Sequence, residues 1–444
     1  MSGPVSGFRG FSHSPVGSKF ARHCFGEKRS AVRPFGGSRI PNSRTAEQPN
    51  AFGHRSATSA GVSCGLKRSG APDLALVVSD TPATVAATFT TNRVQAAPVQ
   101  ISRRKLRGGK FAAIVLNSGN ANCCSGRQGL ADAEATAQEV ARAVKRPAGQ
   151  VFVASTGVIG KPLDMAAIRA GITQAVARLE AAGGQEAAQA ILTTDTTAKE
   201  AAVTFAVGKR RVTIGGMAKG SGMIAPRMAT MLAVLATDAA VGAATLQRAL
   251  RVAVNGSFNC ITVDGDTSTN DMVLCFANGA SGAPALRGGT TALRTFQAAL
   301  EMVCLCLAKM IARDGEGATK LVEVRITGAR TPREARLAAE AVANSPLVKT
   351  TFFGEDINWG RVMAALGRSG ARFDPGAVDL AVDDLPVVEG GVGLGPSSEA
   401  AVNHRLRQPE YALVAHLHAG RASARMWATD LSEAYVRINA GYRT

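Results

Sequence analysis

The chain has 444 residues, of which 46% are apolar, and its formal net charge is +18. This length and apolar content are sufficient for one large mixed domain with a sizeable core. No uninterrupted apolar run reaches the roughly 18 residues of a membrane-spanning helix, so we expect no membrane partner.

The positive charge is concentrated near the N-terminus. Residues 1–60 contain nine Lys or Arg residues, but their only acids are Glu27 and Glu47. Aromatic residues make up 5% of the chain, and no basic run is interleaved with them. A nucleic-acid interface combines clustered basic residues with a recognisable motif. We therefore expect no nucleic-acid partner.

Residues 1–55 are rich in Ser, Gly, Arg and Pro and lack hydrophobic periodicity. This composition is typical of an organelle transit peptide, and simple N-terminal disorder is the alternative. Because the segment has no clear amphipathic period, a chloroplast is favoured over a mitochondrion. We expect an organellar protein whose fold begins after this segment.

After the leader, strand-like and helix-like segments alternate irregularly. In the N-terminal half, the patterns predict strands at 74–79, 85–90, 112–117, 151–154, 201–207 and 211–214, and helices at 132–145, 164–180 and 184–191. In the C-terminal half, they predict strands at 231–237, 272–277 and 321–327, helices at 243–254, 291–312, 332–343, 359–367 and 428–437, and short strands over 376–423. The spacing lacks the regular repeat of a doubly wound sheet. The sequence therefore predicts an α/β protein of the layered α+β type, with mostly antiparallel sheets packed by helices.

One run, residues 219–232, joins two segments of opposite character. Glycines at 215, 216, 220 and 222 make its lead small and flexible, whereas its end is the start of an apolar strand. Thr230 stands at the junction, directly after Ala229. This layout suits a chain that cleaves itself and then uses the new N-terminal Thr as nucleophile and its α-amine as base. The alternative is a glycine-rich loop that leads into a core strand.

Histidines are confined to the two ends of the chain, at positions 13, 23, 54, 404, 416 and 418. A Ser-His-Asp hydrolase would need its base from the C-terminal segment. His416 and His418 alternate within one apolar stretch, so we interpret them as structural residues on one strand face. The shortage of histidine favours another base, such as the α-amine of Thr230. The cysteines form neither a CxxC pair nor a zinc-ligand spacing with His, so we expect no metal.

Three further polar segments are candidates for a site. Thr156 and Gly157 end a predicted strand and can offer a hydroxyl and a backbone N–H to an oxyanion. The Thr-rich segment 193–197 follows a helix, and its alternative role is a turn. Glu316, between two glycines after the predicted helix 291–312, either holds a substrate ammonium or solvates the helix end with its acidic neighbour.

Residues 264–271 are rich in Asp, Ser and Thr but fail as a calcium loop. Thr269 stands where such a loop requires Gly, and Cys275 stands where it requires Glu. A polar turn and a segment that lines a site are the two remaining interpretations.

Several motifs, in order, resemble the arginine-biosynthesis N-acetyltransferases, also called ornithine acetyltransferases or glutamate N-acetyltransferases. The resemblance extends from about residue 60 to 444, and the motifs are residues 65–76, 117–122, 219–232, 264–271, 314–320, 356–361 and 439–444. The chain departs from the family pattern at Cys123, Cys124, residues 354–357 and Arg227, where Asn is usual. We expect Arg227 to influence the cleavage rate or the substrate pocket.

The resemblance implies a self-processing fold of the N-terminal-nucleophile type. Cleavage between Ala229 and Thr230 would give an α chain, residues 56–229, and a β chain, residues 230–444, and two such pairs would form a heterotetramer. Thr230 would be the nucleophile, and Thr156 and Gly157 would form the oxyanion hole. The implied substrate-binding residues are Thr196, Lys219, Thr230, Glu316, Asn439 and Thr444.

The implied reaction transfers the acetyl group of N-acetylornithine to glutamate through an acetyl-Thr230 intermediate, without a cofactor. Acetyl-CoA is an additional candidate donor. The alternative function is an N-terminal-nucleophile amidase or aminopeptidase on a similar fold, which would release its acyl group to water.

Overall fold

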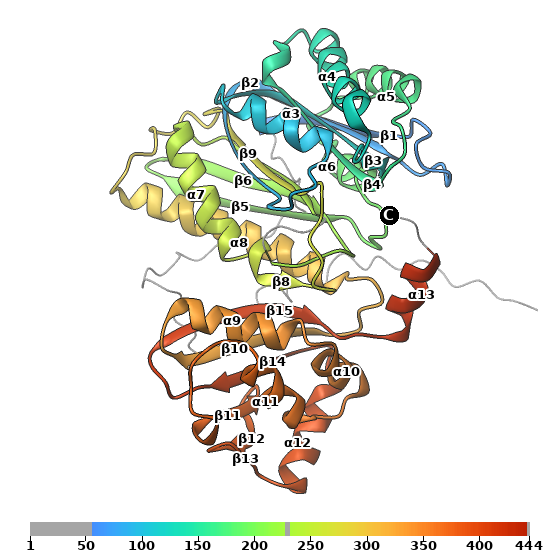
Figure 1. The fold of residues 1–444 in the computed structure, drawn as a ribbon. Coiled ribbons are helices and arrows are strands. Elements are labelled where there is room, and N and C mark those ends of the chain that lie inside the picture. The colour runs from blue at the N-terminus through green and yellow to red at the C-terminus, as the bar shows by residue number, and fades with distance from the viewer. Residues whose placement is uncertain (1–55, 227–230, 442–444) are drawn as a thin grey trace, which may run out of the picture. The chain divides into compact units, whose positions relative to one another are not determined.

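A computed structural model describes residues 56–226 and 231–441 (Figure 1). These residues belong to one compact unit that spans residues 49–444. The leader, Arg227, the bond between Ala229 and Thr230, and Thr444 lie outside the described residues. All the strands and helices predicted from the sequence lie within them.

The first sheet has eight strands within the described residues. Their order is β4-β3-β2-β9-β7-β6-β5, and β1 pairs with β2. Five strand pairs are antiparallel, while β3 with β4 and β7 with β9 run parallel. The strands are β1 (Ala57–Val62), β2 (Leu74–Phe89), β3 (Lys110–Asn120), β4 (Val151–Val158), β5 (Lys199–Val207), β6 (Arg210–Lys219), β7 (Leu232–Thr237) and β9 (Met272–Ala277).

The second sheet, in the same part of the chain, has the order β13-β12-β11-β14-β10-β15-β8. Strand β10 lies between β14, to which it runs parallel, and β15, to which it runs antiparallel. The strands are β8 (Ile261–Thr262), β10 (Leu321–Ala329), β11 (Asp379–Val382), β12 (Leu385–Glu389), β13 (Val392–Gly393), β14 (Glu410–His416) and β15 (Ala422–Thr429).

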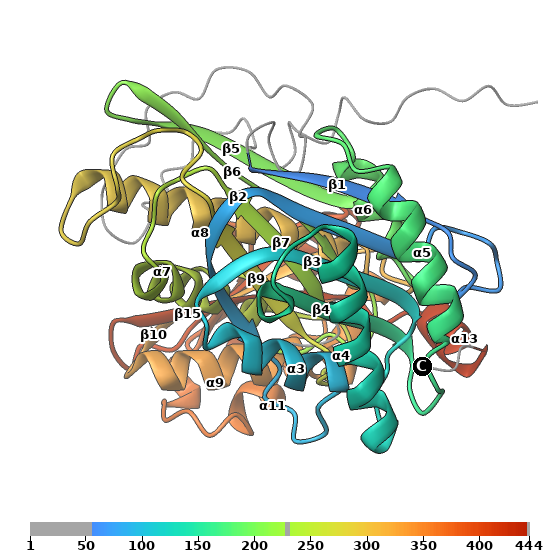
Figure 2. The ribbon, with the colours of Figure 1, turned by 90° about the horizontal axis from the view of Figure 1, so that it is seen from above.

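Helices pack against both sheets, and Figure 2 shows α3, α4 and α5 across one face of β2, β3 and β4. The helices of the first sheet are α3 (Ala97–Leu106), α4 (Gly126–Ala143), α5 (Met165–Ala177), α6 (Gly184–Ala190), α7 (Ala243–Asn255) and α8 (Thr291–Arg313). Those that follow are α9 (Pro332–Ala343), α10 (Pro346–Gly354), α11 (Trp359–Gly367), α12 (Pro396–Leu406) and α13 (Glu433–Gly441).

The central strands of the first sheet are buried on both faces. Along β7, Ala233 and Leu235 contribute to the core beneath α7 and α8, whereas Leu232 and Val234 contribute to a second core. In that second core the rings of Phe111 and Phe276 stack with their centroids 4.2 Å apart. Burial on both faces explains why β7 is a continuous apolar run rather than an alternating one.

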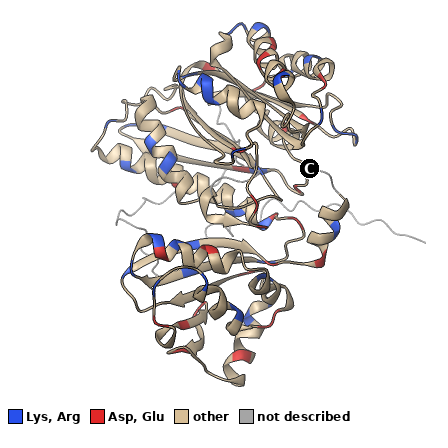
Figure 3. Ribbon diagram, in the orientation of Figure 1, with Lys and Arg blue, Asp and Glu red and all other residues tan. Residues whose placement is uncertain are grey.

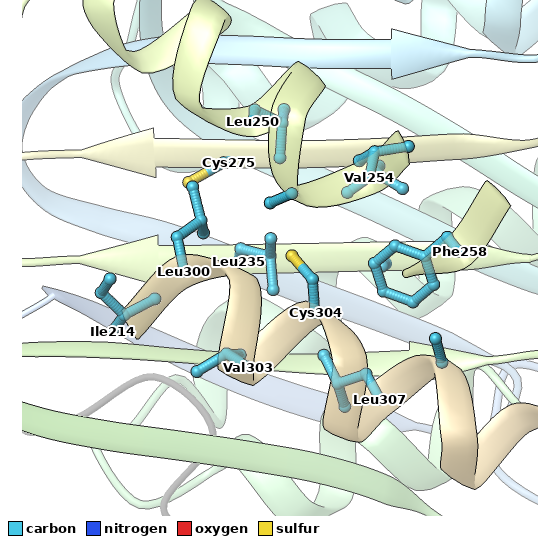
Figure 4. Close-up of a cluster of buried hydrophobic side chains, with 14 of the residues drawn as sticks. Ile214, Leu235, Leu250, Val254, Phe258, Cys275, Leu300, Val303, Cys304 and Leu307 are labelled. Atoms are coloured by element: carbon cyan, nitrogen blue, oxygen red, sulfur yellow. The ribbon is translucent and has the colours of Figure 1, made fainter. Parts of the chain in front are cut away.

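The long helix α8 buries one face against β5, β6 and α7. Figure 4 shows Leu300 and Cys304 of α8 gathered with Leu235 of β7, Cys275 of β9 and Leu250 of α7. By length and composition alone α8 could cross a membrane, but half of its most apolar window is buried within the protein. A core helix meets the same criteria, so α8 is the buried helix that the sequence predicts at 291–312.

Charged residues of both signs are interspersed on helices such as α4 and α9 (Figure 3). On α4, Arg142 pairs with Glu139 at 2.6 Å, and on α9, Arg336 pairs with Glu340 at 2.8 Å. Much of the excess positive charge belongs to residues 1–60, most of which lie outside the described residues.

The predicted fold class, mostly antiparallel sheets packed by helices, is confirmed. The predicted strand 272–277 and helix 332–343 coincide with β9 and α9. The sequence patterns do not predict β1, β8, α3 or α10, and α12 lies within residues 376–423, where short strands were expected.

Three local predictions were wrong. The two strands predicted at 74–79 and 85–90 are the single strand β2, because the chain bulges through exposed residues 80–82 without turning back. Gly216 belongs to β6, where an added Cβ would approach Leu235 to 2.4 Å, so this glycine serves close packing and not flexibility. The helix predicted at 428–437 starts too early, since β15 continues to Thr429 and α13 begins at Glu433.

Candidate functional site

Strand β6 ends at Lys219, and the loop 220–226 leads from it along the chain toward Thr230. The side chain of Lys219 is only 1% exposed. A lysine this deeply buried requires a charged partner. Its ammonium nitrogen lies 3.5 Å from Oδ2 of Asp195. Lys219 is therefore part of a buried ion cluster.

Asp195 is the centre of that cluster. Its fully buried carboxylate accepts hydrogen bonds at Oδ1 from Nζ of Lys199 (2.8 Å) and from the N–H of Gly220 (2.6 Å). Burial acts to raise the pKa of the Asp195 carboxyl, but the ammonium groups of Lys219 and Lys199 bring it well below its usual value. Asp195 is thus an anion at neutral pH that offsets one of the two lysine charges.

Asp314, the residue directly after α8, completes the cluster. Its carboxylate accepts hydrogen bonds from Nζ of Lys199 (2.5 Å), from the N–H of Thr196 (3.0 Å) and from the Thr196 hydroxyl. Its backbone carbonyl accepts a hydrogen bond from the hydroxyl of Ser221 (2.7 Å). Asp314 therefore does more than solvate the end of α8, since it ties Thr196 and the loop 220–226 to that helix.

Glu316 also contacts the loop 220–226. Its N–H donates to the carbonyl of Ser221 (3.0 Å), and its Oε2 accepts a hydrogen bond from the side-chain amide of Asn439 (2.8 Å). A Cβ at position 222 would lie 2.4 Å from the Glu316 carboxylate, so only Gly222 allows this approach. The backbone of Glu316 is thus tied to the loop, and its carboxylate is tied to α13.

Residues 264–271 form a polar turn with long-range contacts. Local hydrogen bonds, such as that from the Asn270 N–H to the Ser268 hydroxyl (3.1 Å), agree with the interpretation of this segment as a polar turn. The carboxylate of Asp264 also accepts hydrogen bonds from the N–H groups of Met223 (2.6 Å) and Ile224 (2.9 Å). The segment is therefore connected to the loop 220–226.

Asp271, at the end of this segment, is fully buried. Its Oδ1 accepts a hydrogen bond from the N–H of Met231 (3.0 Å), while its Oδ2 has no hydrogen-bond partner among the residues that the structure describes. Burial raises the pKa of Asp271 to about 8, although the Met231 N–H and the charge of Lys219 act to lower it. Asp271 is thus mainly a neutral carboxylic acid at pH 7.

Thr156 and Gly157 lie near the end of β4, beside Asn120 of β3. Gly157 has a φ of 125°, and a Cβ there would lie 2.5 Å from the carbonyl carbon of Gly119, so the position requires glycine. The preceding carbonyl, that of Ser155, accepts a hydrogen bond from the side-chain amide of Asn270 (2.8 Å). The oxyanion pair predicted from the sequence is thus connected to the segment 264–271.

The structure brings Lys219, Thr196, Glu316 and Asn439 together around the loop 220–226 through the contacts above. Thr156 and Gly157 join this group through Asn270. Thr230, Ala229 and Thr444 lie outside the described residues.

Three residues of the ion cluster, Asp195, Lys199 and Asp314, were not predicted as partners of the site residues. One signal was available, namely Lys199, two residues before the predicted strand 201–207 and four residues after Asp195. A lysine in that position is seldom buried without a carboxylate partner.

The C-terminal histidines lie elsewhere, on the second sheet. His416 contacts the Thr327 hydroxyl through Nδ1 (2.8 Å), and His418 contacts Asp379 through Nε2 (2.6 Å). His418 lies just beyond β14, so the two do not share a strand face as predicted, although their rings are 4.0 Å apart. A hollow of about 410 Å³ beside them contains none of the site residues.

Within residues 56–226 and 231–441, no three His, Cys, Asp or Glu side chains are grouped as metal ligands would be.

Comparison with known proteins identifies the family. The ArgJ family model matches residues 58–444. The chain belongs to the ArgJ family. It is 53% identical over 387 residues to the arginine biosynthesis bifunctional protein ArgJ of Symbiobacterium thermophilum, covering 87% of this chain and 96% of that protein. The protein of the same name from Geobacter sulfurreducens is 50% identical over 383 residues, covering 86% and 98%.

Two solved structures are also similar in sequence. The ArgJ crystal structure from Bacillus halodurans is 42% identical, covers 46% of this chain and 96% of that chain, and has a TM-score of 0.45. The ornithine acetyltransferase of Mycobacterium tuberculosis in complex with ornithine is 41% identical, covers 40% and 95%, and has a TM-score of 0.36.

Family membership confirms the predicted resemblance and the prediction of an acyltransferase of arginine biosynthesis. The predicted organellar location is wrong, because the relatives found are bacterial proteins. The transit-peptide interpretation of residues 1–55, whether for chloroplast or mitochondrion, has no support either. The error arose because a basic composition rich in Ser, Gly and Pro is not specific to organelle import.

Proposed function

We propose that this chain transfers the acetyl group of N-acetylornithine to glutamate and forms ornithine and N-acetylglutamate. The observation that carries the proposal is the grouping of Lys219, Thr196, Glu316 and Asn439 around one loop that precedes Thr230 in the chain. Both substrates are amino acids, and this group offers an ammonium for a carboxylate and a carboxylate for an ammonium.

The chain first cleaves itself. The hydroxyl of Thr230 attacks the carbonyl carbon of Ala229, and the peptide bond becomes an ester as the nitrogen leaves and takes a proton. Water then hydrolyses the ester. The products are an α chain that ends at Ala229 and a β chain that begins at Thr230 with a free α-amine.

Acetyl transfer then proceeds in two half-reactions. The α-amine of Thr230 accepts the hydroxyl proton while the oxygen attacks the acetyl carbonyl of N-acetylornithine. Thr156 and Gly157 stabilise the tetrahedral oxyanion. Ornithine leaves with the proton, and the amine of glutamate then attacks the acetyl ester and regenerates the Thr230 hydroxyl.

Substrate recognition follows from charge. Lys219 lies beside the carboxylate of Asp195 (3.5 Å), and it pairs with the substrate carboxylate. Glu316 binds the side-chain ammonium of ornithine, with Asn439 orienting its carboxylate. Thr196 and Thr444 complete the set, and no cofactor is required. Acetyl-CoA serves as a second acetyl donor, and two α and two β chains assemble into a heterotetramer.

The function is tested by assaying purified protein with N-acetylornithine in the presence and absence of glutamate. We expect N-acetylglutamate to form only when glutamate is present, and a denaturing gel to show a β chain of about 22 kDa. Thr230→Ala should remain uncleaved and inactive, whereas the exposed Thr173→Ala should behave like the unchanged protein. Equal release of acetate without glutamate would indicate an amidase instead. N-acetylglutamate formed from acetyl-CoA and glutamate alone would establish the second donor.

A further inference from the structure

Two aspartates of the segment 264–271 hold the main chain on either side of the proposed cleavage bond. Upstream of that bond, Asp264 accepts hydrogen bonds from the N–H groups of Met223 (2.6 Å) and Ile224 (2.9 Å). Downstream, Asp271 accepts a hydrogen bond from the N–H of Met231 (3.0 Å), the residue directly after Thr230. A short stretch of chain thus reaches both flanks.

Each flank is held through its carbonyl as well as its N–H. The carbonyl of Ile224 accepts hydrogen bonds from the N–H of Val263 (2.8 Å) and the hydroxyl of Thr262 (3.1 Å). The carbonyl of Met231 accepts a hydrogen bond from the N–H of Met272 (3.2 Å). Ile224 and Met231 are therefore fixed in position and orientation by residues 262–272.

The same segment also reaches the proposed oxyanion strand. The side-chain amide of Asn270 donates to the carbonyl of Ser155 (2.8 Å) and to that of Ala121 (2.7 Å). Ser155 is bonded directly to Thr156. One stretch of chain is therefore in contact with both flanks of the cleavage bond and with the residue that precedes the oxyanion pair.

Fold stability alone does not account for this arrangement at Asp271. Its Oδ2 makes no hydrogen bond of good geometry with the described residues, although the hydroxyls of Ser268 and Thr90 lie near the carboxyl, and full burial disfavours its ionised form. An apolar residue of similar size would avoid that cost but would leave the Met231 N–H without an acceptor. A side chain that is unfavourable for stability and yet touches the residue after a nucleophile points to a functional role.

We propose that Asp264 and Asp271 are positioning residues for self-cleavage: they anchor the main chain on both sides of the bond that is cleaved. The inference rests on the self-cleavage proposed above. Anchoring both ends of the reacting stretch removes conformational freedom before the reaction, and misplacement by about 1 Å costs a reaction of this kind roughly a hundredfold. Neither carboxylate needs to exchange a proton in the step.

The test measures self-cleavage of the full chain over time after cell-free synthesis, on denaturing gels. The variants are Asp264→Ala, Asp271→Ala and Asp271→Asn, and the last keeps a carbonyl oxygen that can accept the Met231 N–H. Asp266→Ala is the matched control, because Asp266 belongs to the same segment but is exposed. Val342→Ala, a fully buried residue of a different core, controls for loss of stability alone. Thermal unfolding is recorded for each variant.

We expect both alanine variants to cleave at least about tenfold more slowly, and Asp271→Asn to recover most of the rate. Asp266→Ala and Val342→Ala should cleave at the rate of the unchanged chain, even if Val342→Ala unfolds at a lower temperature. The proposal is overturned if either alanine variant cleaves at the unchanged rate. It is equally overturned if the rates of all variants, Val342→Ala included, follow their unfolding temperatures. Absence of cleavage in the unchanged chain would instead contradict the proposed function itself.

Discussion

The carboxylate of Glu316 accepts a hydrogen bond of 2.8 Å from the side-chain amide of Asn439, which lies on α13 near the C-terminal end of the described residues. The same carboxylate rests against Gly222, where no side chain intervenes. Parts of the chain that are far apart in the sequence thus define the position of one buried charge beside the loop that precedes Thr230.

Removing that charge should weaken substrate binding. Glu316→Gln keeps the shape of the side chain but removes its negative charge. The side-chain ammonium of ornithine, the product formed from N-acetylornithine, then loses its ionic partner. A hydrogen bond to a charged group contributes about 1.5–3 kcal/mol, so we expect binding of ornithine to weaken by roughly tenfold to a hundredfold. Calorimetric titration measures this directly. The exposed Glu389→Gln is the matched control, and equal affinity in both variants would refute the role of Glu316.

Asp195 should be essential for stability. In Asp195→Asn, Asp314 is the remaining carboxylate of the cluster that offsets the buried charges of Lys199 and Lys219. Breaking a buried ion pair by removal of one partner costs about 3–5 kcal/mol. We expect a clear fall in the unfolding temperature by calorimetry. The control is Glu433→Gln, which breaks a surface ion pair with Arg437 and should change the unfolding temperature little. An equally small change in Asp195→Asn would show that the Asp195 carboxylate does not stabilise the cluster.

Asp271 should make stability depend on pH. Its pKa is raised by burial to about 8 in the folded protein, against about 3.9 in an unfolded chain. Between these values the folded state binds more protons than the unfolded state, so stability is lost as the pH rises toward 8. Asp271→Asn cannot ionise. We therefore expect the unfolding temperature of Asp271→Asn, measured relative to that of the unchanged protein, to rise as the pH increases from 5 to 8. If the difference between the two temperatures stayed constant over this range, Asp271 would not have a raised pKa in the folded protein.

Asn270 should affect the chemical step more than binding. Asn270→Ala removes the donors to the carbonyls of Ser155 and Ala121, which frees the strand end that carries Thr156 and Gly157. Because the oxyanion forms only in the transition state, we expect kcat to fall by roughly tenfold to a hundredfold with KM little changed. The exposed Asn255→Ala is the control. A rise in KM with unchanged kcat would place Asn270 in substrate binding instead.

Much of the fold was predictable because it is encoded locally. The uniformly apolar run of β9 and the amphipathic pattern of α9 predicted these elements at their observed bounds. Where local pattern and tertiary contact disagreed, prediction failed. Residues 80–82 look like a turn, yet β2 continues past them because its two halves pair with β3 and with β9.

The site was predictable only in part. Family motifs indicated Lys219, Glu316 and Asn439, but their shared neighbours depend on contacts between distant residues. Lys199 and Asp314 are more than a hundred residues apart, and no periodicity relates them. The role of residues 264–271 was hidden for the same reason, since the carboxylates of that segment bind backbone groups elsewhere in the chain.

The proposed mechanism requires that Thr230 carries the acetyl group between the two substrates. Mass spectrometry of the β chain, after incubation with N-acetylornithine and without glutamate, tests it most directly. We predict that the β chain gains the mass of one acetyl group, located on Thr230, and loses it when glutamate is added. Steady turnover by a protein whose β chain never carries acetyl would contradict the account.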